Sequence, residues 1–454
     1  MITLKELKPR TYRWLVFLLA VASVAVSPPK YGGVLKYAVF QRSLSLDPVR
    51  VFTTTERWIA GNIFDGLVRY GQGQKLLPAV ASSWEASDDR KTWTFHIAES
   101  AKFHNGRKIS ANDVRYSWQR SLRNADPDAL SQCGLLLISG AEKYRARARN
   151  MVEGIQVLDD STLRISLEQP GDSFLAMLIS PLTWIVPRES VGKSDFNTRP
   201  IGCGPFKISS SSGKGDEVLQ LEANKEYAWG RPYLDRINFV FVPDFNTALL
   251  QFGIGDVDCL EIPNIEFGKF RGESGWSSQL MTFPNSRYVC LRINKEAFQG
   301  AEKIPNILKC GIDTRSIMEM LYNQGDPGSG DYQSERAGKL AAEFRNSSWG
   351  RLIVPDFSSD AIQVAKRIES DLAKIGVRIE ILTLSRSEFQ KAISDKSFTL
   401  SLEFFPSAVS IPDTGSYLPL FRQHVSILHK PDIYGLADIT PQDVFQLDDV
   451  YFFK

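Results

Sequence analysis

The side chains of this 454-residue chain that could act as catalysts or metal ligands are few and scattered. Four histidines occur, and none stands in an H-E-x-x-H motif or in a Cys/His zinc spacing: His96, His104, His424 and His429. The sequence contains no G-x-S-x-G nucleophile elbow. These patterns predict no catalytic residue, no metal site and no cofactor, so we do not expect an enzyme.

Two short motifs have weaker chemical interpretations. The glycines of Gly202-Cys203-Gly204-Pro205 could cradle a phosphate, but the Lys and Ser/Thr of a P-loop and the third glycine of a dinucleotide loop do not follow. We therefore predict a tight strand entry in which glycine allows positive φ or close backbone approach. Asp256 and Asp258 lack the further oxygen ligands that calcium needs, which favours a turn at a helix end.

The five cysteines are widely spaced, without a C-x-x-C motif: Cys133, Cys203, Cys259, Cys290 and Cys310. Their odd number leaves at least one thiol unpaired within the chain, and the pairing of the others cannot be deduced. We interpret them as small buried apolar residues. One disulfide among them would fit an oxidising compartment.

Composition indicates a large soluble protein. At 454 residues, two or three lobes are expected rather than one core. The apolar share of 43% and the charged share of 23% are typical of globular proteins. The formal net charge of +2 and the absence of a basic stripe argue against a nucleic-acid partner, so the many aromatic residues are predicted to line cores and a ligand site.

The first 27 residues resemble an export signal. Four basic residues precede the apolar run Trp14–Val26, which is shorter than the ~20 residues that span a bilayer, and small residues follow as a cleavage site. An uncleaved anchor and a buried first helix are the alternatives. No cysteine lies near the cleavage point, so we expect a free periplasmic protein without a lipid anchor.

The stretch from Lys91 to Leu122 has the clearest secondary-structure pattern. Trp93, Phe95 and Ile97 alternate with polar residues, which predicts a half-buried strand. Asn105-Gly106 indicates a turn. After a helix-capping Ser110, apolar residues recur every four positions up to Leu122, which predicts a helix.

The same stretch carries a family resemblance. FHNGRKISANDVRYSWQR (residues 103–120) resembles the signature of the family 5 extracellular solute-binding proteins, the peptide- and nickel-type receptors of ABC importers. Further segments resemble that family in the same order: GGVLKY and LDP (32–48), NIFDGL (62–67), LLPAVASSWEASDD (76–89), IGCGPFKI (201–208), NKEYAWGRPYLD (224–235) and GIGDVD (253–258).

The resemblance implies an α/β fold, the two-lobed periplasmic binding protein of type II and cluster C, with a small extra domain inserted in the first lobe. We predict a signal peptide (1–27), a discontinuous lobe I (31–52, 187–283 and 432–454), an inserted domain (53–186) and a lobe II (284–431). The lobes would close about a hinge of two crossing strands.

Lobe II has its own pattern. Ile362, Ala365, Ile368 and Leu372 recur at helical spacing, which predicts the helix 360–374 with Ser358 or Ser359 as cap and Gly376 as terminator. Ser385 and Glu388 form a capping box for a second helix. Strands are predicted at 377–382 and 398–404, which together indicate a mixed sheet covered by helices.

By resemblance, the chain captures a short peptide in the periplasm and delivers it to an ABC permease in the inner membrane. The peptide backbone would be bound by strand-like hydrogen bonds. We expect a monomer. The residues that the resemblance places in the ligand site, each of which could equally be ordinary packing, are Phe40, Gln41, Ser43, Tyr116, Cys203, Tyr288, Ala408, Val409 and Ser410.

Two departures bear on the ligand. The peptide-binding members have an aspartate for the ligand ammonium where this chain has Ser410, and Asp413 is a distant substitute. About two helices of lobe II are also missing after this segment. A receptor of the same fold for a nickel chelate or an oligosaccharide is one alternative, and a scaffold or chaperone-like protein that no longer transports is the other.

Overall fold

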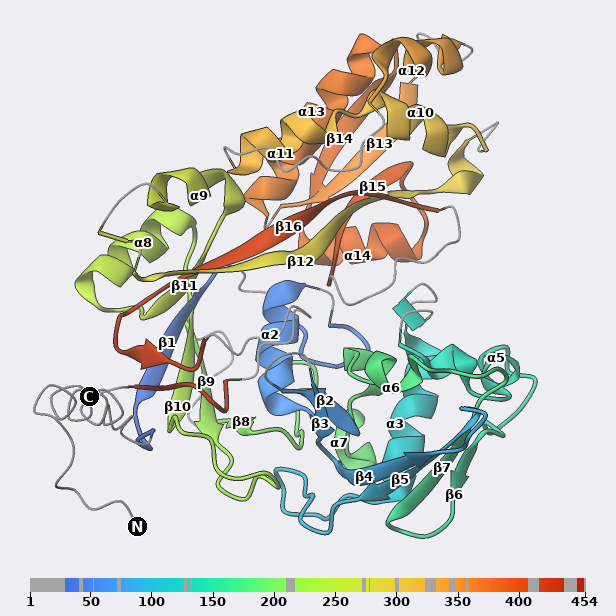
Figure 1. Cartoon of the computed structure of the whole chain (residues 1–454), viewed down its shortest axis with the longest axis vertical. Coiled ribbons are helices and arrows are strands. Elements are labelled where there is room, and N and C mark those ends of the chain that lie inside the picture. Colours follow the sequence, from blue (N-terminus) through green and yellow to red (C-terminus); the bar gives the residue numbers. More distant parts are fainter. Residues whose placement is uncertain are drawn as a thin grey trace, which may run out of the picture.

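Figure 1 shows the computed structural model of the chain. It describes residues 29–40, 44–51, 53–71, 75–125, 129–130, 133–209, 217–271, 275–276, 278–298, 302–322, 332–342, 348–356, 358–406, 416–436 and 447–452. The predicted signal peptide lies outside the described residues. Sheets flanked by helices form two lobes, and the α/β class is as predicted.

One large mixed sheet runs through both lobes. Its strands are β1 (Val34–Val39), β8 (Phe206–Ile208), β9 (Val218–Ala223), β10 (Arg236–Phe241), β11 (Cys259–Ile262), β12 (Leu280–Ile293), β13 (Ser348–Pro355), β14 (Arg378–Leu384), β15 (Leu400–Pro406) and β16 (Tyr417–His429). Within the described residues, these ten strands pair in the order β14-β13-β15-β12-β16-β11-β1-β10-β9-β8.

Strands β12 and β16 belong to both lobes. They pair antiparallel from Leu280↔Leu428 to Arg292↔Tyr417, with register shifts after Phe283 and after Val289. β16 extends into lobe I by pairing with β11, and β12 extends into lobe II by pairing with β15. The chain therefore passes between the lobes on the two crossing strands that the resemblance implies (Figure 1).

Helices cover both faces of the lobe I sheet. Leu35, Tyr37 and Val39 of β1 pack on one face with Trp58 of α2 (Thr54–Ile63). Ala38 packs on the other face with residues of α8 (Phe245–Ile254) and α9 (Asn264–Arg271). Successive strand residues point to opposite faces, so β1 is buried on both. We call the α2 side of the sheet its front face.

The small domain has a separate sheet and core. Strands β4 (Ala81–Ala86), β5 (Thr92–Ile97), β6 (Ile155–Val157) and β7 (Thr162–Ser166) pair in the order β4-β5-β7-β6. The predicted alternation in β5 is confirmed, since Trp93, Phe95 and Ile97 are buried. The predicted helix is α3 (Ala111–Asn124), which buries Val114, Trp118 and Leu122 against this sheet's cluster.

Lobe II is built as a strand–helix alternation. Helix α13 (Ser359–Lys374) begins after Ser358, whose hydroxyl accepts the Ala361 N–H at 3.2 Å, and α14 (Arg386–Ser394) begins after the predicted Ser385/Glu388 capping box. Leu352 and Val354 of β13 pack in a cluster with α13, whereas Ile353 packs with Phe389 of α14. The two helices therefore lie on opposite faces of the lobe II sheet.

The remaining elements are short. They are β2 (Val68–Tyr70), β3 (Leu76–Pro78), β17 (Ile433–Tyr434) and β18 (Tyr451–Phe452); α5 (Ala141–Arg145), α6 (Phe174–Met177), α7 (Arg188–Val191), α10 (Ile304–Gly311), α11 (Thr314–Tyr322) and α12 (Ser334–Leu340); and the 3-10 turns η2 (Leu135–Leu137), η3 (Pro181–Thr183) and η4 (Lys295–Ala297).

The division into lobe I, inserted domain and lobe II remains our proposal. Separate apolar clusters support it: one around α3 and β5, one around β1 and α2, and one beneath α13. At the proposed border near residue 284, β12 continues without a break, and the register shift after Phe283 falls at that point.

Candidate functional site

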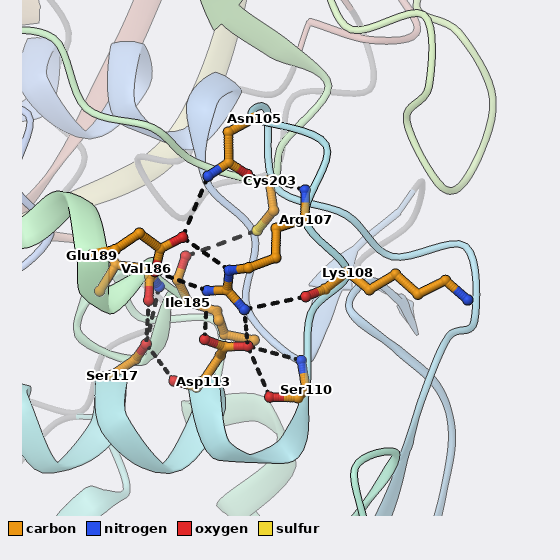
Figure 2. A network of polar contacts seen from close by, with 10 residues as sticks. All are labelled: Asn105, Arg107, Lys108, Ser110, Asp113, Ser117, Ile185, Val186, Glu189 and Cys203. Atoms are coloured by element: carbon orange, nitrogen blue, oxygen red, sulfur yellow. Dashed lines mark hydrogen bonds and ion pairs between the residues drawn. The ribbon is translucent and has the colours of Figure 1, made fainter.

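The family signature forms a polar network around one arginine (Figure 2). Arg107 donates two hydrogen bonds to Asp113, at 2.9 and 2.8 Å, and two to Glu189, at 2.9 and 3.1 Å. Asp113 also accepts the backbone N–H and the hydroxyl of Ser110, both at 2.9 Å. The contact with Arg107 lowers the pKa of the Glu189 carboxyl. We call Asn105, Arg107, Ser110, Asp113, Ser117 and Glu189 the signature network.

Helix α3 uses the same signature to hold the segment that leads out of the inserted domain. The Ser117 hydroxyl donates to the Asp113 carbonyl at 2.7 Å and accepts the Val186 N–H at 2.9 Å. The Trp118 indole donates to the Thr183 carbonyl at 3.0 Å. These bonds satisfy buried polar groups on both sides, so this part of the motif is structural.

The predicted glycine turn is a close backbone contact. A Cβ on Gly202 would lie 2.0 Å from the Ile63 carbonyl oxygen, and one on Gly204 would lie 2.8 Å from the Ile63 carbonyl carbon. The Gly204 N–H donates to that carbonyl oxygen at 2.8 Å. The prediction of close approach is confirmed, and neither glycine has a positive φ.

His104 holds this turn with both ring nitrogens. Its Nδ1 accepts the Gly202 N–H at 3.3 Å, which leaves the proton on Nε2 to be donated to the Gly204 carbonyl at 3.0 Å. Burial lowers the pKa of His104 from 6.5 to about 4, because the charged ring would be poorly solvated here. The neutral imidazole is therefore the form that fits the turn.

A buried ion pair joins α3 to the loop that follows β1. Arg120 donates to both carboxylate oxygens of Asp47, at 2.8 and 2.5 Å, and both side chains are nearly inaccessible. Glu56 of α2 also contacts this loop, because its carboxylate accepts the N–H groups of Ser45 and Thr53 at 2.7 and 3.0 Å. The loop is thereby fixed against two helices.

The register of the strands defines which residues face the opposite lobe. Ile353, on the α14 side of β13, is paired with Ser401, and Ser401 is paired with Arg292 of β12. Side chains alternate along a strand, so Tyr288, four positions before Arg292, lies on the same side of β12 as Arg292. Figure 1 shows α14 on the side of β12 and β16 that faces α2 of lobe I. We call Tyr288, Arg292, Ser401, Glu403 and Arg422 the interlobe face.

Two arginines of the interlobe face differ in their partners. Arg292 is 3.7 Å from the Glu403 carboxylate, and that carboxylate also accepts the Ser401 hydroxyl at 2.5 Å. Arg422 lies over the Tyr288 ring, 4.7 Å from its centroid, and donates to the Tyr288 hydroxyl. The side chain of α14 residue Gln390 reaches the Arg50 carbonyl at 3.4 Å, so this side of lobe II touches the loop after β1.

The described candidate residues do not form one cluster. Phe40 is partly buried against the apolar cluster of α8 and α9, and Tyr116 is half-buried near α2 with Arg188 over its ring at 5.7 Å. The Cys203 thiol is buried, 3.7 Å from the Asp65 carbonyl, and burial raises its pKa. Tyr288 lies on the interlobe face. Ligand contact by any of these stays a prediction.

Five candidates lie outside the described residues: Gln41, Ser43, Ala408, Val409 and Ser410. Two further residues were not predicted from the sequence. Arg422 stands in no motif, and the partner of Glu189, Arg107, is 82 residues away in the chain. The only signal for Arg422 in the sequence is the apolar stretch around it, which resembles a strand.

Three further features concern metal binding, disulfides and membrane spans in the described part of the chain. There, no three His, Cys, Asp or Glu side chains come close enough together to hold a metal ion. All five cysteines are described, and all are buried free thiols. No helix among the described residues has the length and apolar character needed to cross a bilayer.

Comparison with known proteins agrees with this architecture. Residues 75–425 match the family described as "Bacterial extracellular solute-binding proteins, family 5 Middle". Heme-binding protein A of Haemophilus influenzae is 25% identical over 405 residues, which are 81% of this chain and 73% of the relative. The periplasmic oligopeptide-binding protein OppA of Salmonella typhimurium is 27% identical over 295 residues, 62% of this chain and 53% of the relative.

A solved structure shows the same fold. The murein tripeptide binding protein MppA of Escherichia coli superposes with a TM-score of 0.80 at 19% identity, covering 94% of this chain and 99% of MppA. The resemblance first inferred from the signature is thereby confirmed, together with the two-lobed fold. The chain belongs to the bacterial extracellular solute-binding proteins of family 5.

Proposed function

We propose that this chain is the solute-capturing component of an ABC importer in the periplasm. It binds a short peptide between its lobes and passes the peptide, chemically unaltered, to a permease in the inner membrane. Its relatives include a periplasmic oligopeptide-binding protein, which supports a peptide, and a heme-binding protein, which supports a second class of solute.

The observation that carries the proposal is the double crossing of the chain between the lobes on β12 and β16. Two adjacent strands allow the lobes to rotate about one line while each core stays intact, which is how hinged receptors enclose a ligand. The contact between Gln390 of lobe II and the Arg50 carbonyl lies on the side of these strands where such a ligand would be enclosed.

A receptor for a non-peptide solute is the second candidate. Heme-binding protein A matches over 81% of this chain, a larger share than OppA covers, which favours keeping this candidate. A nickel chelate and an oligosaccharide are the forms that we predicted. The scaffold alternative rests on the short connection between β15 and β16 alone.

A thermal-shift panel of di- and tripeptides, heme, a nickel–histidine chelate and oligosaccharides separates these functions. A ligand at 100 times its Kd stabilises the folded state by about 2.7 kcal/mol, which raises the melting temperature by several degrees. A rise with peptides supports the proposal, and a rise with one of the others alone supports the second candidate. No rise with any compound, together with no small molecule released from protein purified from the periplasm, contradicts both.

A further inference from the structure

Arg422 is an exposed guanidinium at the point where the two lobes meet. Its neighbours along β16, Phe421 and Gln423, are both buried. Phe421 packs in the cluster beneath α13, so Arg422, the next residue, points to the opposite side of the strand. Its cross-strand partner Tyr288 points the same way, which places both side chains on the interlobe face.

The charge of Arg422 is not balanced by a carboxylate in the described residues. Its one hydrogen bond there is to the neutral Tyr288 hydroxyl, and its one ring contact is with the same residue. Nearby charges are already paired: Glu403 is the partner of Arg292, and Asp47 is the partner of Arg120. A guanidinium has five N–H donors, so the described residues leave most of the hydrogen-bonding capacity of Arg422 unused.

The contact with Tyr288 also orders the guanidinium. Stacking on the ring and the bond to the hydroxyl hold a side chain that would otherwise lose about 2 kcal/mol of rotamer entropy on binding. A planar, pre-ordered fork matches the two oxygens of a carboxylate in a bidentate pair. A phosphate dianion would bring two negative charges to a single cation, so the carboxylate is the better match.

We propose that Arg422, supported by Tyr288, binds a carboxylate of the transported solute, and that this receptor selects carboxylate-bearing solutes. This inference rests on the proposed function as a receptor and names the class of its solute. It assigns to lobe II a specificity residue that binds an anion.

The experiment begins with the full chain, exported and purified from the periplasm as wild type and as Arg422→Gln. Small molecules released by denaturation are identified by mass spectrometry. Compounds enriched on the wild type and depleted on Arg422→Gln are expected to be carboxylic acids. Each is then tested by calorimetry as the free acid and as its methyl ester, beside trialanine against trialanine amide and glutathione against its diethyl ester.

We expect the wild type to bind the acid form ~10- to 100-fold more tightly than the neutral form, since a hydrogen bond to a charged group contributes roughly that factor. Arg422→Gln should remove this preference, and Tyr288→Phe should reduce it. The matched control is Arg351→Gln, which removes another exposed strand arginine of lobe II that is paired with Glu380. This variant should keep the preference, and the melting curves of all variants report folding.

Equal affinity for the two forms, or an unchanged preference in Arg422→Gln, would overturn this inference and leave the receptor function standing. Enriched compounds without a carboxylate would do the same. A wild type that releases no compound and binds none of the probes would instead contradict the proposed function itself.

Discussion

The signature network and the interlobe face both contain arginines on aromatic rings, but they use those charges differently. In the signature network, Arg107 gives four hydrogen bonds to Asp113 and Glu189 and lies over Phe103 at 4.7 Å. On the interlobe face, Arg422 has only the neutral Tyr288 as partner among the described residues. Arg107 is fully used within the fold, whereas Arg422 has no acidic partner among the described residues.

Under our proposal, this difference separates the residues that identify the family from the residue that selects the solute. The signature residues fasten α3 to residues 183–189, a task that is the same whatever the solute is. Arg422 of the interlobe face belongs to none of the segments that resemble the family, and its side chain is exposed. We therefore expect substitutions in the first region to change stability and substitutions in the second to change affinity.

The largest effect on stability is expected for Gly202→Ala. Its Cβ would lie 2.0 Å from the Ile63 carbonyl oxygen, so the backbone would have to move and the His104 contacts would be strained. We expect a loss of roughly 3 kcal/mol or more in the free energy of unfolding, measured by urea denaturation. Gly192→Ala is the control, because nothing lies within 4 Å of its Cβ. Equal stability of the two variants would contradict the close contact.

Asp113→Asn should have the next largest effect. It leaves Arg107 without its bidentate partner and weakens the start of α3, while the guanidinium remains partly exposed to water. The expected loss is about 2 kcal/mol, less than for a fully buried pair because water screens the guanidinium. Glu189→Gln removes an exposed partner of the same arginine and should cost under about 1 kcal/mol. A larger loss of stability in Glu189→Gln than in Asp113→Asn would contradict this ranking. A change in solute affinity without a change in stability would place the signature network in the ligand site.

The pH dependence of stability should contain a contribution from His104. Its pKa is about 4 in the folded protein and near 6.5 when unfolded, because burial disfavours the charged ring. As the pH falls, the unfolded state therefore binds a proton at His104 before the folded state does. The contribution of neutral His104 to the free energy of unfolding is complete above about pH 7 and is lost as the pH falls toward 4. The loss should be about 2 kcal/mol between about pH 7 and pH 5.

The His104 contribution is measured by urea denaturation at several pH values. His104→Gln should be less stable than the wild type at neutral pH, and its stability should lack this part of the dependence on pH. An identical slope in wild type and variant would show that the ring is not buried as described.

The smallest effect is expected at the cysteines, whose thiols should react only slowly in the native protein. All five are buried, and burial raises the pKa of Cys133 to about 12 and that of Cys203 well above its usual value. Thiolates are the reactive form, so native protein should react with Ellman's reagent over hours and unfolded protein within seconds. Rapid labelling of Cys203 in the native state, blocked by solute, would move this residue from the core to the ligand site.

Regular patterns and caps allowed local structure to be predicted. Helix α13 has a clean apolar spacing, a capping serine and a terminating glycine, and its predicted range differs from the observed one by a single residue. Strand β5 showed its alternation for the same reason, since one face is buried in a core. In these segments local preference and tertiary packing agree.

The hinge and its arginine could not be predicted from the sequence alone. Strand β16 begins at Tyr417, where the sequence lacks the alternation of a half-buried strand. Residues 417–424 include Pro419, Arg422 and Gln423 and do not alternate, because register shifts change which side faces the core. Tyr288 was found only through the resemblance. The partner of Arg422 follows from a cross-strand register, which no local pattern encodes.

The number of residues between β15 and β16 limits how much further lobe II could be shortened. Both strands pair antiparallel with β12, one on each side, so they are parallel to each other. The last residue of β15, Pro406, is paired with Arg287, and the first residue of β16, Tyr417, is paired with Arg292, so ten residues of sequence separate the two strands. Parallel crossovers need about a dozen residues, so a further deletion here would pull β16 out of register and break the link between the lobes.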